Sequence, residues 1–171
     1  MSCTIPTDPI QSSPPKGGCA SSRSKWIPGP PMLLLLAICS MVVLHLLLPV
    51  AGVQTPAWRL LGLLPLIAGI VLNLAADRAL REAGTTVKPL LDTTALLTKG
   101  VFAVTRNPMY FGFILLLSGI WLSLGSLSPG LVVAVFAVLI DRYYVRPEEE
   151  KLTRTFGEAF RAYRGRVGRW F

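Results

Sequence analysis

Charged side chains are scarce in this sequence. They make up 15% of its 171 residues, whereas soluble domains carry about 25%, and 52% of the residues are hydrophobic. So few charges cannot cover a surface that faces water, and so many apolar residues exclude a chain that is disordered throughout. The composition therefore favours a protein that lies in a membrane.

Cysteine and histidine are also rare. The three cysteines (Cys3, Cys19 and Cys39) are odd in number and lack the spacing of a metal site. They therefore predict neither a disulfide framework nor a metal centre. The one histidine, His45, lies within an apolar stretch, and we assign it a structural bond to a neighbouring helix.

Three long stretches contain no Asp, Glu, Lys or Arg, and together they define the membrane spans. A bilayer core about 30 Å thick needs about 20 helical residues. The first stretch holds one span (32–53), and the second holds a short one (60–76). The third is too long for one helix and is interrupted by glycine, serine and proline, so it predicts a hairpin of two spans (108–124 and 131–144). The sequence thus predicts an all-α membrane protein with about four transmembrane helices.

The basic residues fall almost entirely on one side of these spans. They lie in the N-terminal tail, in the loop 77–107 and after residue 141, whereas Arg59 alone faces the other side. By the positive-inside rule both termini are then cytoplasmic, and the net charge of +8 gives no reason to expect a nucleic-acid partner. Residues 1–26, rich in Ser, Pro and Gly, predict a disordered tail, so that 27–171 form the membrane domain.

The loop 77–107 ends in a polar motif that allows two interpretations. In the structural one, Asn107 is an N-cap, Pro108 is the first residue of the third span, and Arg106 and Tyr110 anchor the chain at the membrane interface. In the functional one, the same helix N-terminus presents free N–H groups and a positive dipole to an anion.

A second polar cluster follows the fourth span. Three adjacent glutamates, Glu148 to Glu150, open a predicted amphipathic cytoplasmic helix over 148–164, where acidic residues also complement the helix dipole. The basic residues of this helix suit contact with anionic membrane lipid. Both clusters lie on the same predicted side of the membrane, so we expect them to meet near the ends of the third and fourth spans.

Several motifs, in order along residues 62–171, resemble those of one known family. They are Gly100-Val101-Phe102, the run RNPMY at 106–110, and the pair Glu148-Glu149 with Leu152, Phe156-Gly157, Tyr163 and Val167 after it. The chain resembles the isoprenylcysteine carboxyl methyltransferase family, and more narrowly its bacterial relatives with RNPMY in place of RHPxY. The match is specific because both main motifs occur in order and are separated by a helical hairpin.

This resemblance implies an integral membrane methyltransferase that uses S-adenosylmethionine and lacks the Rossmann fold. It would be a multi-pass protein of the bacterial inner membrane. Carried over by position, the implied cofactor-binding residues are Leu96, Leu97, Thr98, Gly100, Phe102, Asn107, Pro108, Tyr110, Glu148 and Glu149. The family's substrate-binding arginine, four residues before the paired glutamates, is replaced here by Tyr144, so Arg142 or Arg146 is expected to take its place.

The implied reaction is carboxyl O-methylation of a prenyl-like or other lipid-like acceptor that arrives from the bilayer. A second acceptor class is a phospholipid amine. The residues also leave two other functions open. One is a membrane reductase that binds NADPH. The other is a non-enzymatic membrane scaffold, in which RNPMY is a helix cap and the glutamates only complement a helix dipole.

Overall fold

The computed structural model describes residues 29–50, 52, 56–83 and 96–170, and within these ranges all regular structure is helical. Its elements, in chain order, are α1 (Pro30–Leu47), α2 (Pro56–Leu61), α3 (Leu63–Glu82), the 3₁₀ turn η1 (Gly100–Ala103), α4 (Pro108–Leu124), α5 (Ser128–Ile140), the π turn η2 (Asp141–Val145) and α6 (Arg146–Arg166). The predicted tail, 1–26, lies outside the described residues. The predicted all-α fold is confirmed.

Three of the described helices are long and apolar enough to cross a membrane, and α4 is a shorter apolar helix of 17 residues. Many large apolar side chains point away from the bundle, such as Leu46 (72% exposed) and Leu64 (69% exposed). A contiguous apolar surface of this kind is suited to lipid rather than to water. The chain is an integral membrane protein with several passes.

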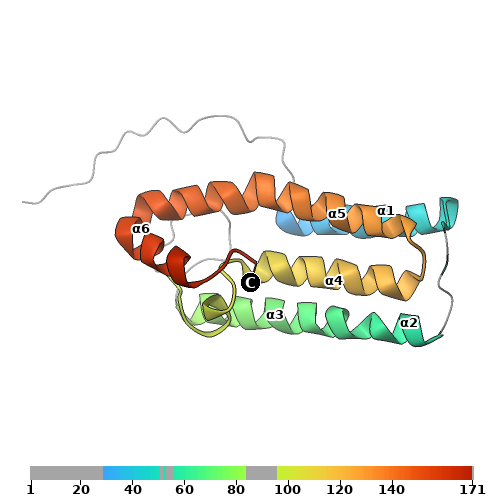
Figure 1. Cartoon of the computed structure of the whole chain (residues 1–171), viewed down its shortest axis with the longest axis horizontal. Helices are drawn as coiled ribbons and strands as arrows, with labels where there is room; N and C mark the ends of the chain where they lie inside the picture. Colours follow the sequence, from blue (N-terminus) through green and yellow to red (C-terminus); the bar gives the residue numbers. More distant parts are fainter. Residues whose placement is uncertain (1–28, 51, 53–55, 84–95, 171) are drawn as a thin grey trace, which may run out of the picture.

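The helices lie side by side in a bundle (Figure 1). Helix α3 packs along α4, and α1 packs along α5. The chain then continues from α5 into α6, which extends beyond the end of the bundle and turns back toward the start of α4 (Figure 1). This return brings the segment after α6 to the N-terminal end of α4.

Glycines permit the close approach of α3 and α4. A Cβ atom placed on Gly69 would lie 2.6 Å from the carbonyl oxygen of Gly112, and one on Gly119 would lie 2.6 Å from the backbone nitrogen of Leu66. Real Cβ atoms do not approach backbone atoms so closely, so any side chain at these positions would force the helices apart. This packing fixes α4, and hence the RNPMY motif at its start, relative to α3.

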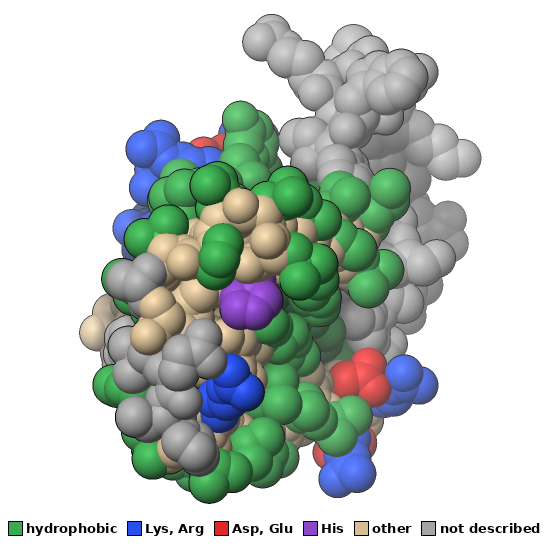
Figure 2. Space-filling model, turned by 90° about the vertical axis from the view of Figure 1, so that its right-hand side faces the viewer, with side chains coloured by type: hydrophobic (Ala, Val, Ile, Leu, Met, Phe, Trp, Pro, Cys, Tyr) green, Lys and Arg blue, Asp and Glu red, His purple; other side chains and the backbone are tan. Residues whose placement is uncertain are grey.

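The far end of the bundle is closed by the turn between α4 and α5. His45 Nδ1 lies 2.7 Å from Ser126 Oγ, and the Trp121 indole N–H donates to the Ser126 carbonyl oxygen at 2.9 Å. Figure 2 shows this end, where the histidine lies at the surface between hydrophobic side chains and other groups coloured tan. His45 therefore joins α1 to the α4–α5 turn. This contact agrees with the structural role that the sequence predicts for His45.

The predicted helix limits differ from the observed ones where charged residues are involved. The third span, 108–124, matches α4. The second span was predicted to end at residue 76, but the apolar helix runs over Ala57–Glu82, so the first residues of the predicted loop 77–107 are helical. The physical reason is that Asp77 and Arg81 form an i,i+4 ion pair, which supports the helix where it leaves the apolar region.

The predicted break between the fourth span (131–144) and the C-terminal helix (148–164) is also absent. Helical structure runs over Ser128–Arg166, through the π turn η2 and with one kink at Gly157. The Arg146 N–H donates to the Asp141 carbonyl oxygen, five residues earlier, and Pro147 follows directly. Proline has no N–H group to donate to an earlier carbonyl oxygen. The π turn widens the helix just before Pro147, and this lets the helix continue through the proline.

Candidate functional site

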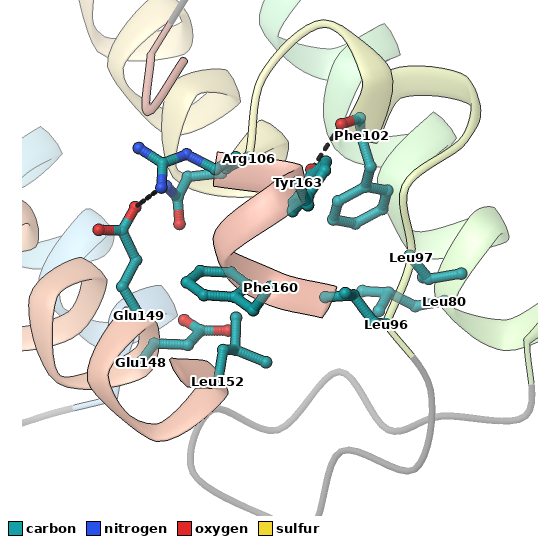
Figure 3. Close-up of a pocket in the computed structure, with 11 residues that line it drawn as sticks. Leu80, Leu96, Leu97, Phe102, Arg106, Glu148, Glu149, Leu152, Phe160 and Tyr163 are labelled. Carbon is teal, nitrogen blue, oxygen red and sulfur yellow. Dashed lines mark hydrogen bonds and ion pairs between the residues drawn. The ribbon is translucent and has the colours of Figure 1, made fainter. Parts of the chain in front are cut away.

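A cavity lies where α6 returns to the start of α4 (Figure 3). Its lining residues come from the end of α3, the segment 96–107 and both halves of α6, and they are Leu80, Leu96, Leu97, Phe102, Arg106, Asn107, Glu148, Glu149, Leu152, Phe160 and Tyr163. The two polar clusters of the sequence thus meet at one cavity, although Tyr110 at the end of the first and Glu148 at the start of the second are 38 positions apart.

The return of α6 depends on one glycine. Gly157 has φ 50° and ψ −120°, a backbone conformation that residues with a Cβ rarely adopt. The kink lets the second half of α6 place Phe160 and Tyr163, both buried, against the cavity. The Tyr163 hydroxyl donates to the Phe102 carbonyl oxygen and so ties α6 to η1 (Figure 3).

The RNPMY turn is held from both sides. The backbone N–H of Asn107 donates to Thr105 Oγ1 at 3.2 Å, and the Asn107 carbonyl oxygen accepts from the N–H of Phe111 in the first turn of α4. Asn107 occupies the N-cap position, but its side chain makes no cap hydrogen bond. The predicted N-cap position of Asn107 is therefore confirmed, while its side chain donates to the Arg169 carbonyl oxygen at 3.3 Å and does not cap α4.

Tyr110 connects the two motifs directly. Its hydroxyl donates to Glu148 Oε2 at 3.0 Å, and its side chain is 9% exposed. The ring also lies near that of Tyr144, with centroids 6.3 Å apart. A membrane-interface anchor would be exposed, so the structural interpretation of Tyr110 is wrong, and the residue instead orients a carboxylate beside the cavity.

Glu149 is the centre of a buried charge network. Its side chain is 7% exposed and lies 2.7 Å from Nη2 of Arg169 and 3.3 Å from Nη1 of Arg106. Arg169 also reaches Asp141 Oδ1 at 3.2 Å. The hydrogen bond to Glu149 raises the pKa of Arg169, and the two carboxylates add to the effect, so this guanidinium remains charged.

Arg106 lines the cavity, and two of its guanidinium nitrogens make no hydrogen bond to the described residues. Its side chain is 8% exposed, which contradicts the predicted role as an interface anchor. Among the described residues, its Nε has no hydrogen-bond partner, and Nη1 lies beside Glu149 without hydrogen-bond geometry. Burial lowers the pKa of Arg106, an effect that the Glu149 carboxylate opposes. Buried donors without partners are costly, so this site favours an anionic or hydrogen-bond-accepting ligand.

The structure gathers most of the residues that the resemblance implied. Six of them line the cavity: Leu96, Leu97, Phe102, Asn107, Glu148 and Glu149. Thr98, Gly100, Pro108 and Tyr110 lie in the same segments but do not line the cavity itself. Their roles in binding stay predictions.

The two arginines expected to bind substrate lie outside the cavity. Arg142 is exposed, and Arg146 is also exposed and is paired with Asp141 at 2.7 Å. Sequence reasoning missed Arg106 and Arg169 as partners of the paired glutamates. For Arg106 the signal was present, because it opens the RNPMY motif; for Arg169 no local pattern pointed to Glu149.

Comparisons with known proteins give a family match and one bacterial relative. The profile of the family described as phospholipid methyltransferase (PEMT) matches residues 57–159. The chain is also similar to an uncharacterised protein from Haemophilus influenzae, with 34% identity over 62 residues, which is 36% of this chain and 98% of that one.

A solved structure has a similar fold. It is the eukaryotic intramembrane Ras methyltransferase ICMT (isoprenylcysteine carboxyl methyltransferase), with a TM-score of 0.62 and 20% identity. The similarity covers 82% of this chain and 51% of the other, so the chain spans about half the length of that protein. At this level of identity the likeness establishes the fold.

The family match covers more than half of the chain and includes both motifs up to the second half of α6. This protein therefore belongs to the phospholipid methyltransferase family of membrane enzymes, whose methyl donor is S-adenosylmethionine.

Proposed function

We propose that this chain transfers a methyl group from S-adenosylmethionine to a lipophilic acceptor at the edge of the membrane. The observation that carries the proposal is the meeting of the RNPMY turn and the paired glutamates around one cavity. This cavity also holds a buried arginine, Arg106, whose Nε has no hydrogen-bond partner in the part of the chain that the structure describes. Family membership and this arrangement support an enzyme over the scaffold interpretation, in which these side chains would have no ligand to bind.

The cavity suits the chemical groups of S-adenosylmethionine, which are a sulfonium, an amino group, a carboxylate, a ribose and a flat adenine. Glu148 offers a carboxylate to the amino group or ribose, and the unpartnered donors of Arg106 suit the carboxylate. Leu96, Leu97 and Phe102 supply an apolar wall for the flat ring. The residues present therefore fit the cofactor.

The chain's own residues would contribute mainly by positioning. When bound, S-adenosylmethionine supplies an electrophilic methyl group. Tyr110 fixes one oxygen of Glu148, and Arg169 fixes both oxygens of Glu149, so these carboxylates are oriented before any ligand arrives. Leu152 and Phe160 add apolar wall to the cavity, and with a ligand bound they would limit the access of water to its polar contacts.

The choice of acceptor depends on the need for a base. A carboxylate acceptor needs none, whereas an amine acceptor must lose a proton. No histidine or lysine is present among the described residues that line the cavity, and both glutamates are already engaged by Tyr110, Arg106 and Arg169. This favours a carboxyl group on a prenyl-like or other lipid-like molecule. The name of the family favours the second candidate, a phospholipid amine.

We place the cavity and both termini at the cytoplasmic face of a bacterial inner membrane. The support is the positive-inside pattern together with the exposed basic residues of α6, which are Arg154, Arg161, Arg164 and Arg166. On this side they would face the anionic inner leaflet, from which a lipid acceptor would arrive.

The test is a transfer assay with methyl-labelled S-adenosylmethionine, the purified full chain and a total membrane lipid extract. We expect labelled product in the lipid phase. Label that is released as methanol by mild base identifies a methyl ester, whereas base-stable label that comigrates with N-methylated phospholipid identifies the amine. If no label is transferred and the protein binds no cofactor, the proposal is refuted; a response to NADPH instead would support the reductase.

A further inference from the structure

We propose that Arg169 is a positioning residue that holds Glu149 in place and joins both halves of the cavity. The inference rests on the proposed function and goes beyond it, because Arg169 is outside the paired motifs and does not line the cavity. Its role would be to act on the cofactor through Glu149.

The side chain of Arg169 donates two hydrogen bonds to the Glu149 carboxylate. Its Nη2 donates to Glu149 Oε2 at 2.7 Å, and its Nε donates to Oε1 at 3.3 Å. This two-point contact fixes the plane of the carboxylate, which a single donor cannot do. The third nitrogen, Nη1, donates to Asp141 Oδ1 at 3.2 Å and anchors the guanidinium on the π turn η2.

The backbone of the same segment holds the other motif. The Arg169 carbonyl oxygen accepts from Thr105 Oγ1 at 3.0 Å and from Asn107 Nδ2 at 3.3 Å. The neighbouring Gly168 carbonyl oxygen accepts from the Arg106 N–H at 3.1 Å. Arg169, which follows the end of α6, therefore contacts both the RNPMY turn and Glu149.

The charge balance explains why this contact matters for orientation. Glu149 is buried, and a buried carboxylate needs hydrogen-bond donors. Arg106 lies 3.3 Å away without hydrogen-bond geometry, and its Nε has no partner within the described ranges 29–50, 52, 56–83 and 96–170. Because Arg169 satisfies Glu149, the Arg106 donors stay available to the cavity. Without Arg169, we expect Arg106 to turn toward Glu149 and close the anion-binding position.

The experiment compares three variants of the purified full chain in detergent. Arg169→Ala removes the side-chain grip and leaves the backbone contacts, and Arg169→Lys keeps the charge but loses the two-point geometry. The matched control is Arg166→Ala, which removes an exposed arginine near the same end of α6. The measurements are the dissociation constant of S-adenosylhomocysteine by calorimetry, the melting temperature without ligand, and KM and kcat for S-adenosylmethionine.

We expect Arg169→Ala to weaken binding by about tenfold or more, Arg169→Lys to weaken it by a smaller factor, and Arg166→Ala to leave it unchanged. KM should rise more than kcat falls, because the residue positions the ligand and does not touch the reacting atoms. If Arg169→Ala fails to fold, Arg169→Lys decides, provided that its melting temperature matches the wild type.

Unchanged affinity in a folded Arg169→Lys and Arg169→Ala, beside a wild type that binds, would overturn this inference and leave the proposed function standing. Equal loss of affinity in Arg166→Ala would also overturn it, because the effect would then be one of general charge. A wild-type chain that binds no S-adenosylhomocysteine would overturn the proposed function, and the inference with it.

Discussion

The hydrogen bond between Tyr110 and Glu148 offers a clean perturbation, because Tyr110→Phe removes one oxygen and keeps the ring. The ring is buried at 9% exposure and will still fill its place against the bundle. What is lost is the donor that lies 3.0 Å from Glu148 Oε2. If this carboxylate holds the cofactor, the loss should reach binding without unfolding the protein.

The magnitude follows from the type of bond. A hydrogen bond to a charged group contributes about 1.5–3 kcal/mol, and each 1.4 kcal/mol is about tenfold in a dissociation constant. We therefore expect Tyr110→Phe to weaken the binding of S-adenosylhomocysteine by about 10- to 150-fold, measured by calorimetry in detergent. The control is Tyr143→Phe, which removes a hydroxyl from a side chain that is 54% exposed on the neighbouring turn.

The same hydrogen bond is present without ligand, so the melting temperature of the ligand-free Tyr110→Phe protein should fall by a few degrees, while that of Tyr143→Phe should match the wild type. The reasoning is refuted if Tyr110→Phe binds as tightly as Tyr143→Phe. It is also refuted if the affinity falls only in proportion to a general loss of stability, since the hydroxyl would then support the fold alone.

Three further predictions test other parts of the structure. Gly119→Ala should destabilise the bundle by about 1–3 kcal/mol, seen as a lower melting temperature, because its Cβ would meet backbone atoms of the α2–α3 region. The control is Gly165→Ala, which has open space around it and should have no such cost. Equal melting temperatures in the two variants would contradict the packing argument. Glu148→Gln keeps the shape but removes the charge, so it should raise KM for S-adenosylmethionine by tenfold or more at neutral pH; an unchanged KM would exclude Glu148 from cofactor binding. Arg142→Ala and Arg146→Ala should raise KM for the lipid acceptor but not for S-adenosylmethionine in the transfer assay, and normal KM values in both would remove these residues from the acceptor site.

The fold was predictable where the sequence marks its own boundaries. The span 108–124 begins at a proline suited to a first helical turn and ends before Gly125, which adopts a left-handed conformation (φ 71°). The predicted span 60–76 ends at the first charge, but a helix can continue past the membrane edge, as α3 does beyond Asp77. The placement of charged residues predicts which segments lie in the membrane, but it does not predict the residue at which a helix ends.

The candidate site was predictable only in part, for a related reason. The motifs name the residues that meet, and the cavity contains six of the ten that were implied. Arg106 was interpreted as an anchor because a local pattern cannot reveal burial. Arg169 was missed because its contact with Thr105 joins residues 64 positions apart, and it depends on the turn that Gly157 introduces into α6. Such a contact is set by tertiary packing.

A structure of the full chain with bound S-adenosylhomocysteine would test the central claim most directly. We predict one ligand per chain, with its amino-acid end between Arg106 and Glu148 and its adenine against the segment 96–102. Density for the ligand at another place on the protein, or a saturated sample in which this cavity stays empty, would contradict the account.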